Sequence, residues 1–221
     1  MLKVTVKDLE HDDITKTYVE KANDYLNILG YTSHGLRHVR LASDIARNIL
    51  LRLGYNEDEA ELAAIAAFLH DIGNVCGRDH HEQSGAIMAK DVLDRLGLQA
   101  KYVAEVMLAI GNHEERTGYP VSVTSAATIL ADKTDVHRSR VQTKDPLDFD
   151  IHDKVNYAVT RSFLNVDKDD RTITLELTID TKVAGIVEYF EIFLDRMKMS
   201  QRAARFLKTR FQLDINGTLL M

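Results

Sequence analysis

A set of histidine and aspartate side chains in this sequence could together bind divalent transition metals. Imidazole nitrogens combined with carboxylate oxygens suit Fe, Mn, Zn, Co or Ni, whereas Ca²⁺ prefers oxygen ligands alone. Any single histidine is more often a hydrogen-bonded core residue than a metal ligand. Several such residues at expected helix ends favour a shared metal site instead. The candidate ligands are His38, His70, Asp71, His81, His113 and Asp132.

His70 and Asp71 are the most informative pair because of the residues that precede them. Residues 60–69 are apolar on nearly every face, which is typical of a buried helix. An ionisable group away from water is costly unless it is hydrogen-bonded or bound to a metal ion. The pair therefore predicts either a polar helix end that reaches solvent or two metal ligands, and the other candidates favour the ligands.

Composition and charge narrow the class of protein. Hydrophobic residues make up 45% and charged residues 28%, which is typical of a soluble globular protein with a sizeable core. The formal net charge of −6 argues against general nucleic-acid binding, which normally needs a basic surplus. Cys76 is the single cysteine, so no internal disulfide can form, as in a reducing compartment. With no apolar run of signal-peptide or membrane-spanning length, we expect a cytoplasmic protein without a membrane partner.

The elements that would position these ligands are mostly helices, because apolar residues recur at helical spacing as far as about residue 135. Ser33 is expected to cap the helix that ends at Gly54. Asn56 and Glu59 are expected to form a capping box for the following helix. Short polar loops join these helices, so the candidate ligands can converge on one cavity. The expected helices span about residues 12–29, 34–53, 57–70, 83–96, 100–111 and 124–135.

The pattern changes from helical to alternating near residue 150. Residues 155–159 and 172–179 alternate with a period of two and predict strands, with a turn at 168–170 between them. A long helix is expected over about 182–209, followed by a strand over 211–217. This order predicts a small β-β-α-β unit whose hairpin is antiparallel.

Two units are therefore expected in the chain. Residues 1–150 would form the helical metal-binding domain, and residues 151–221 a small α+β appendage. Segment 136–152, with several charges and a proline, is the natural linker or lid between them.

The order of the candidate ligands resembles the H…HD…D signature of the HD-domain superfamily of metal-dependent phosphohydrolases. The matching residues are His38, His70 with Asp71, and Asp132, and the resemblance covers about residues 20–140. It implies that the fold is mainly α, an HD-domain helical bundle to which the small C-terminal β-β-α-β appendage is attached.

Other stretches resemble particular branches of that superfamily. Residues 81–85 are similar to the H-x-x-x-G of members that bind two metals, and residues 112–120 to the HHE…GYP of cyclic-dinucleotide phosphodiesterases. Residues 130–138 look like the branch that hydrolyses diadenosine tetraphosphate. However, Asn74 replaces the lysine of many HDIGK sequences and Asn112 replaces the first histidine of HHE. These differences weigh against cyclic-di-GMP hydrolysis, and the subfamily stays unassigned.

Carried over by position, the resemblance implies a binuclear site for divalent transition metals. The first metal would be bound by His38, His70, Asp71 and Asp132. Asp71 would bridge to a second metal, which His81 and His113 complete. His34 lies four residues before His38 and is expected on the same helix face, where it is an extra ligand, a phosphate contact or a surface histidine.

Polar side chains near these ligands are candidates for contact with the substrate. The candidate catalytic residues are Asp71, Lys133 and Asn112. Lys133 or Arg138 could neutralise phosphoryl oxygens, whereas Arg140 is expected on a solvated face. Asn112 and Asn74 could orient the substrate through hydrogen bonds.

The function favoured by the sequence is a metal-dependent phosphohydrolase that uses a metal-bridging hydroxide. Its substrate would be a small-molecule phosphate mono- or diester, most plausibly a nucleotide. Two alternatives remain open because the same ligands serve them: an HD-fold di-iron oxygenase, and a non-catalytic metal-binding regulatory module whose appendage forms a homodimer. Ligand types alone do not fix the chemistry of a site.

Overall fold

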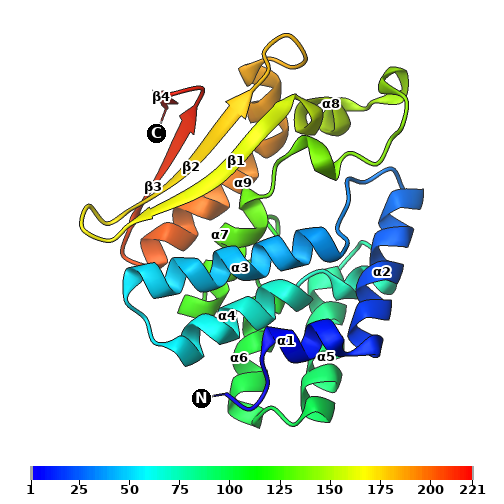
Figure 1. Cartoon of the computed structure of the whole chain (residues 1–221), viewed down its shortest axis with the longest axis vertical. Coiled ribbons are helices and arrows are strands. Elements are labelled where there is room, and N and C mark those ends of the chain that lie inside the picture. The colour runs from blue at the N-terminus through cyan, green and yellow to red at the C-terminus, as the bar shows by residue number, and fades with distance from the viewer. Residues whose placement is uncertain (1, 221) are drawn as a thin grey trace.

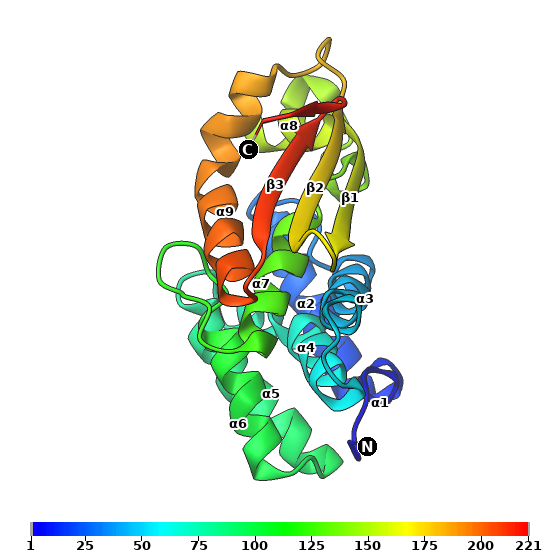
Figure 2. The ribbon, with the colours of Figure 1, turned by 90° about the vertical axis from the view of Figure 1, so that its left-hand side faces the viewer.

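A bundle of helices carries a small β-sheet at one end of the molecule (Figures 1 and 2). The computed structural model describes residues 2–220. The bundle contains α1 (Val6–His11), α2 (Asp13–Ile28), α3 (Leu36–Leu53), α4 (Glu57–Leu69), α5 (His81–Leu96), α6 (Ala100–Gly111) and α7 (Val123–Thr134). The 3₁₀ helices are η1 (Ile72–Val75), η2 (Arg138–Arg140) and η3 (Pro146–Asp148). The C-terminal elements are α8 (Ile151–Ala158), β1 (Val159–Asp167), β2 (Thr172–Ile179), α9 (Ile186–Phe206), β3 (Arg210–Ile215) and β4 (Thr218–Leu219).

Helix α4 lies at the centre of the bundle and determines where the candidate ligands sit. Its start is fixed by the predicted capping box, in which the Asn56 side chain accepts from the Glu59 amide and the Glu59 side chain from the Asn56 amide. Ala60, Ala63 and Ala67 pack into a hydrophobic cluster with α3, α7, α9 and the sheet. Phe68 and Leu69 belong to a second cluster with α1, α2, α5 and α6. Packed from both sides, the helix end has no freedom to move towards solvent.

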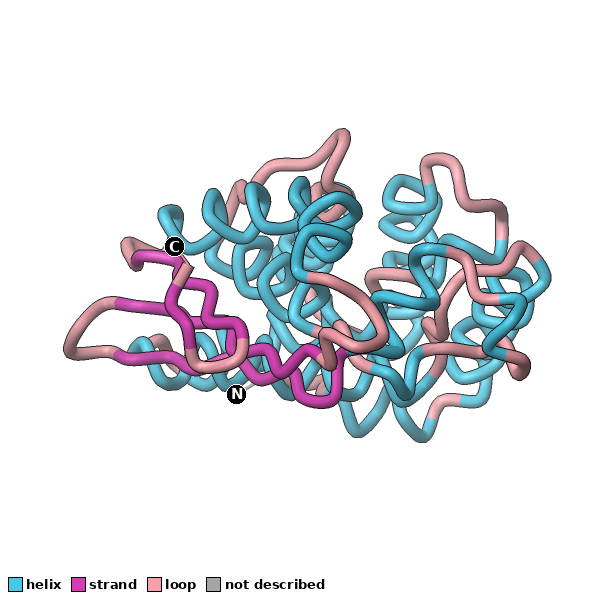
Figure 3. Tube along the Cα trace, turned by 90° about the horizontal axis from the view of Figure 1, so that it is seen from above, coloured by secondary structure: helices cyan, strands magenta, loops and turns pink. Residues whose placement is uncertain are grey.

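The sheet has the strand order β1-β2-β3-β4 (Figure 1). Seen from above, the strands lie together at one side of the helices (Figure 3). β1 and β2 form the predicted antiparallel hairpin, β2 and β3 are parallel, and β3 and β4 are antiparallel. Helix α9 makes the crossover between the parallel strands, as such a pair requires. The prediction of a mainly α fold with a small C-terminal β-β-α-β unit is therefore confirmed.

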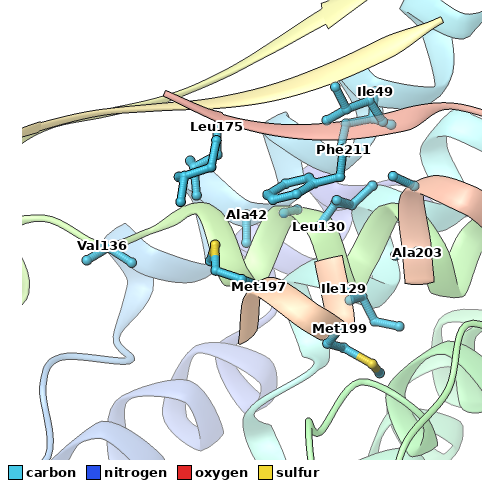
Figure 4. Packing of buried hydrophobic residues seen from close by; sticks show 14 of the residues in the cluster. Ala42, Ile49, Ile129, Leu130, Val136, Leu175, Met197, Met199, Ala203 and Phe211 are labelled. Atoms are coloured by element: carbon cyan, nitrogen blue, oxygen red, sulfur yellow. The ribbon is translucent and has the colours of Figure 1, made fainter. Parts of the chain in front are cut away.

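One hydrophobic cluster joins the C-terminal unit to the helices (Figure 4). Leu175 and Phe211 of the sheet, Met197 of α9 and Leu130 of α7 are all buried in it. The predicted boundary near residue 150 stays a prediction, but apolar packing is continuous across it. Helix α9 is thereby held against α7, which carries one of the candidate ligands.

Two local predictions were wrong, and each has a physical reason. Residues 155–158 are helical, because the Asp150 side chain accepts from the Asp153 amide and caps α8; the strand begins only at Val159. Ser33 does not cap α3, which begins after Gly35. The Ser33 hydroxyl donates instead to the Asn23 side chain, 3.2 Å away.

Among residues 2–220, no helix combines the length and apolar character needed to cross a bilayer.

Gly73 lets η1 pack directly on the start of α5. A Cβ at this position would overlap the carbonyl oxygen of His81 and the amide nitrogen of Gly85. Both contacts are to backbone, so no side-chain rotation could relieve them. This close approach holds the His70-Asp71 segment beside His81.

We expect Gly73→Ala to destabilise the fold by about 2 to 3 kcal/mol, as overpacking of a rigid core does. The matched control is Gly111→Ala, where an added Cβ meets nothing within 4 Å. That control should change the free energy of unfolding by less than about 1 kcal/mol. Urea unfolding measures both variants. Equal stabilities for the two variants would contradict the assigned role of Gly73.

Candidate metal centre

The predicted ligands converge on one buried cluster, although they come from different elements. His38 lies on α3, His81 is the first residue of α5 and Asp132 lies on α7. The others follow the ends of α4 and α6. Each of these residues is at most 6% exposed. The full set is His38, His70, Asp71, His81, His113 and Asp132, in three overlapping groups with metal-ligand spacing.

The Asp71 carboxylate divides this cluster into two halves. Its Oδ2 lies 3.0 Å from His70 Nε2 and 3.8 Å from His38 Nε2. Its Oδ1 lies 3.4 Å from His81 Nε2 and 3.9 Å from His113 Nε2. One carboxylate thus presents a different oxygen to each pair of imidazoles, which is the arrangement expected of a bridging ligand.

Asp132 lies beside the imidazoles of the first half, and it also forms a group of metal-ligand spacing with His70 and His113. Its Oδ1 lies 3.5 Å from both His38 Nε2 and His70 Nε2. The first half therefore contains two imidazoles and two carboxylates, while the second contains His81 and His113 with the shared Asp71. The assignment of these ligands to a first and a second metal stays a prediction.

Hydrogen bonds at Nδ1 orient each imidazole so that Nε2 faces the cluster. His70, His81 and His113 donate through Nδ1 to the carbonyl oxygens three residues before them, over 2.7 to 3.0 Å. His38 donates through Nδ1 to Asp135 Oδ2, 2.8 Å away. A carbonyl oxygen can only accept, so the proton of a neutral ring is on Nδ1 and the lone pair is on Nε2. Such outer partners are typical of metal-bound histidines.

The contacts inside the cluster fit divalent metals. His38 Nε2 lies 3.4 Å from His70 Nε2, and His81 Nε2 lies 3.2 Å from His113 Nε2. Lone pairs that face each other at these distances repel unless a proton or a cation lies between them. In addition, Asp71 Oδ2 is buried, and it has a hydrogen-bond donor among the described residues only when the neighbouring His70 Nε2 carries a proton. A metal ion in each half would satisfy all of these atoms.

The charge states of the cluster follow from its crowding. Burial lowers the pKa of His70, but the carboxylates of Asp71 and Asp132 outweigh it and raise that pKa to about 10. Burial lowers the pKa of His113, and the neighbouring His70 and His81 lower it further, to about 3. Although burial raises the pKa of Asp71, His70 and His34 hold it well below its usual range. Both aspartates therefore stay ionised and available to a metal at neutral pH.

Asn74 orients Asp71 rather than a substrate. Its Nδ2 donates to Asp71 Oδ1, 3.0 Å away, and to the Asp71 carbonyl oxygen, 2.9 Å away. Its Oδ1 accepts from Arg78 Nη1 over 3.4 Å. Since Asn74 is fully buried, this amide is a fixed support for the bridging carboxylate.

A chain of ion pairs leads from Asp132, which is buried, to the partly exposed Arg196 of the C-terminal unit. Lys133 Nζ contacts Asp132 Oδ2 at 2.5 Å and Glu115 Oε1 at 3.1 Å. Arg196 Nε, from α9, lies 3.0 Å from the same Glu115 oxygen. Burial lowers the pKa of Lys133, but these carboxylates outweigh it and raise that pKa above its usual value. Lys133 is thus charged, and it forms ion pairs with two carboxylates.

Arg140 contradicts the expectation of a solvated face, because it is only 1% exposed. Its Nη1 donates to the Asp135 carbonyl oxygen and its Nε to the Ser33 carbonyl oxygen, over 2.8 and 3.0 Å. Asp135, the partner of His38, also binds Arg37. The sequence did not single out Asp135, and its place one turn after Asp132 is the signal that could have found it.

The remaining candidates lie at different distances from the cluster. His34 precedes α3 instead of lying on it, yet its ring centroid is 5.5 Å from that of His38 and the residue is only 8% exposed. It is therefore not a surface histidine. The Asn112 amide donates back to the Leu108 carbonyl oxygen on α6, and Arg138 lies over the Tyr157 ring. Neither Asn112 nor Arg138 lines the cavity beside the cluster.

That cavity has a volume of about 670 Å³ and reaches the cluster at His34 and His81. Its walls come from the segments around residues 29–34, 78–82 and 114–117, and from α8 and α9. The volume falls in the range of small-molecule sites. The C-terminal unit therefore forms part of the wall of the site.

Comparisons with known proteins show which chains are similar to this one. The family model described as HD domain matches residues 35–158, which is more than half of the chain. An uncharacterized protein of Methanocaldococcus jannaschii is 26% identical over 223 aligned positions, which cover 86% of this chain and 83% of that protein. A crystal structure of a "predicted HD superfamily hydrolase" from an uncultured Thermotogales bacterium has a TM-score of 0.44. It is 28% identical and covers 61% of this chain and 75% of that chain.

Metal affinity should rise with pH across the neutral range. Below about pH 10 His70 carries a proton in the metal-free protein, and a metal must displace it. Releasing that proton becomes easier as the pH rises, so affinity should increase by up to about tenfold per pH unit. Calorimetric titration with Co²⁺ in buffers of different ionisation enthalpy measures the released proton. A pH-independent affinity without proton release would contradict the charge assigned to His70.

Asn74→Leu should weaken metal binding, because the Asp71 carboxylate loses the amide donor of Asn74 while the side-chain volume is kept. We expect a loss of about tenfold in affinity, as for other outer partners of metal ligands. Asn112→Leu is the control, since that amide is directed back onto α6. Competition with a chelator measures both. Equal affinities in the two variants would show that Asn74 does not support the bridging carboxylate.

Proposed function

The chain belongs to the HD domain family, and from this premise we propose that it is a metal-dependent phosphohydrolase acting on a phosphate mono- or diester. The observation that carries the proposal is the Asp71 carboxylate, whose oxygens face separate pairs of imidazoles. This arrangement supports a binuclear centre with His38, His70 and Asp132 on one side. His81 and His113 lie on the other side.

Two bound divalent cations would supply an acidified water as nucleophile and would stabilise charge on a phosphoryl oxygen. The residues of the chain prepare the site for that chemistry. Asp71 and Asp132, both ionised, offset the positive charge of the metals. Lys133 orients Asp132 and is itself fixed by Glu115, so its role is to position a ligand.

Arg78 is the side chain best placed to contact the reacting phosphoryl group. Its Nη1 donates to His81 Nε2 over 3.3 Å and its Nη2 to Glu114 Oε2 over 3.4 Å, both long contacts. A substrate oxygen beside His81 would be a stronger acceptor for either nitrogen. Arg78 thus takes the role that the sequence suggested for Arg138.

The finer part of the proposal is that the ester is a nucleotide. The cavity is large enough for one, and the Tyr31 ring at its wall is 43% exposed. Aromatic rings that remain open in a cavity suit flat heterocycles by stacking. The guanidinium of Arg78 lies 5.5 Å from the centre of the Tyr31 ring. This contact keeps the ring close to the place proposed for the reacting phosphoryl group.

Turnover should depend on Asp71. Protein loaded with Mn²⁺, Co²⁺ or Fe²⁺ should hydrolyse at least one member of a panel of nucleotides, cyclic nucleotides and aryl phosphate diesters. Loss of a residue that only hydrogen-bonds to a metal ligand typically costs about 10- to 100-fold in activity. Asp71→Asn should lower turnover by more than this, because Asp71 is proposed to be a ligand of both metals. Phosphate release and metal content are measured together.

The control for that variant is Asp91→Asn, an exposed position on α5, which should keep full turnover and full metal content. Equal turnover in the two variants would refute the bridging role. If no ester is hydrolysed and the iron-loaded protein consumes O₂ instead, the chain is a di-iron oxygenase and the proposed function is wrong.

A further inference from the structure

Arg196 extends from the C-terminal unit to the wall of the cavity. It lies on α9 (Ile186–Phe206), beyond residues 35–158 that match the family model. Its side chain is 24% exposed and lines the same cavity as His34 and His81. The site therefore includes a cation that the family-matched segment does not supply.

The guanidinium of Arg196 is held in a fixed orientation. Its Nε binds Glu115 Oε1 at 3.0 Å, and its plane lies over the Phe193 ring, 4.9 Å from the ring centre. An anchor at one nitrogen and a ring beneath the plane remove most of the freedom of a long side chain. Within residues 2–220, the two terminal nitrogens Nη1 and Nη2 have no hydrogen-bond partner, and together they form a two-pronged donor.

Other cations of the cavity are arranged differently. Arg78 uses both terminal nitrogens, on Asn74, His81 and Glu114. Arg116 is exposed, and no described contact fixes it. Carboxylates outnumber cations on the wall, so an anion there needs a specific donor; the acids are Asp79, Glu82, Glu114, Glu115, Asp150 and Asp195. Arg196 is the fixed cation whose donors remain open.

We propose that Arg196 binds a second oxyanion of the substrate, one that is not bound to the metals. The geometry that carries this is the guanidinium fixed between Glu115 and Phe193, on a side chain that lines the cavity and whose terminal nitrogens have no described hydrogen-bond partner. The inference rests on the proposed function for the group at the metals. It adds that the substrate carries a further phosphoryl or carboxylate group, and that the C-terminal unit selects for it.

The location of Arg196 separates this subsite from the metals. Lys133 and Glu115 lie between Arg196 and the ligand Asp132. An anion bound to Arg196 is therefore beyond the reacting phosphorus, on the leaving group or on the group that is retained. A bidentate contact between a guanidinium and an oxyanion is among the stronger and more directional polar contacts.

The test compares anions that reach Arg196 with one that does not. Methylphosphonate offers a single oxyanion, whereas phosphonoacetate, phosphonopropionate and phosphonobutyrate add a carboxylate at increasing distance, and methylenediphosphonate adds a phosphoryl group. Their dissociation constants are measured with Co²⁺-loaded protein from the visible spectrum of the metal, and metal content is checked afterwards. We expect at least one two-anion probe to bind about tenfold or more tightly than methylphosphonate.

Arg196→Gln should abolish that preference and leave the affinity for methylphosphonate unchanged. Arg196→Lys keeps the positive charge but not the two-pronged donor, so it should keep only part of the preference for two-anion probes. Arg202→Gln is the matched control, because Arg202 lies on the same helix over the exposed Tyr119 ring and does not line the cavity. It should behave as the unaltered protein.

Two results would overturn the inference: no preference for any two-anion probe in the unaltered protein, or an equal preference in Arg196→Gln. A preference that depends on the distance between phosphonate and carboxylate would show that the subsite binds a carboxylate. A preference confined to methylenediphosphonate would show that it binds a phosphoryl group. The outcome is independent of turnover. Protein that hydrolyses no ester but shows the Arg196-dependent preference would refute the proposed reaction and keep the subsite.

Discussion

The structure depends on one carboxylate that is buried between two pairs of imidazoles. Asp71 is buried, so positive charge must balance its carboxylate: either the proton on His70, whose Nε2 lies 3.0 Å from Asp71 Oδ2, or a bound cation. The imidazoles that surround it are oriented by Nδ1 hydrogen bonds and present lone pairs inward. A cluster of acceptors of this kind is stable only with protons or metals inside it. The buried charges therefore suit a divalent metal site, and the fold has to supply enough rigidity to keep these side chains together.

That rigidity comes from α4 and its surroundings. The helix packs into two hydrophobic clusters at once, and η1 follows it in direct contact with the first turn of α5. Both halves of the centre are therefore fixed to the same rigid element. Small residues make this possible: the alanines of α4 let α3 and α7 approach, and Gly73 lets two backbones meet. Close packing of this sort holds ligand atoms within the narrow tolerances that a metal site needs.

The C-terminal unit extends the site through charge as well as packing. The chain Asp132–Lys133–Glu115–Arg196 alternates in sign, and it connects a ligand on α7 to a helix that follows the sheet. Each buried charge in it has an opposite neighbour, which lowers the cost of desolvation. The unit therefore shapes both the electrostatics and the wall of the cavity. We expect HD domain proteins that share these ligands, but have a different C-terminal unit, to differ in substrate.

The sequence by itself determined the helical bundle and the order of the candidate ligands, because residue type and local spacing carry that information, whereas a bridging role for Asp71 came only from the family resemblance and stays a prediction. It also predicted the capping box at Asn56 and the antiparallel hairpin. Only the tertiary structure decided which polar residues face the cluster. Asn74 supports Asp71 while Asn112 is directed away, and Arg140 is buried while Arg196 reaches the cavity from far along the chain. Side-chain direction and contacts between distant segments depend on packing, which no local pattern encodes.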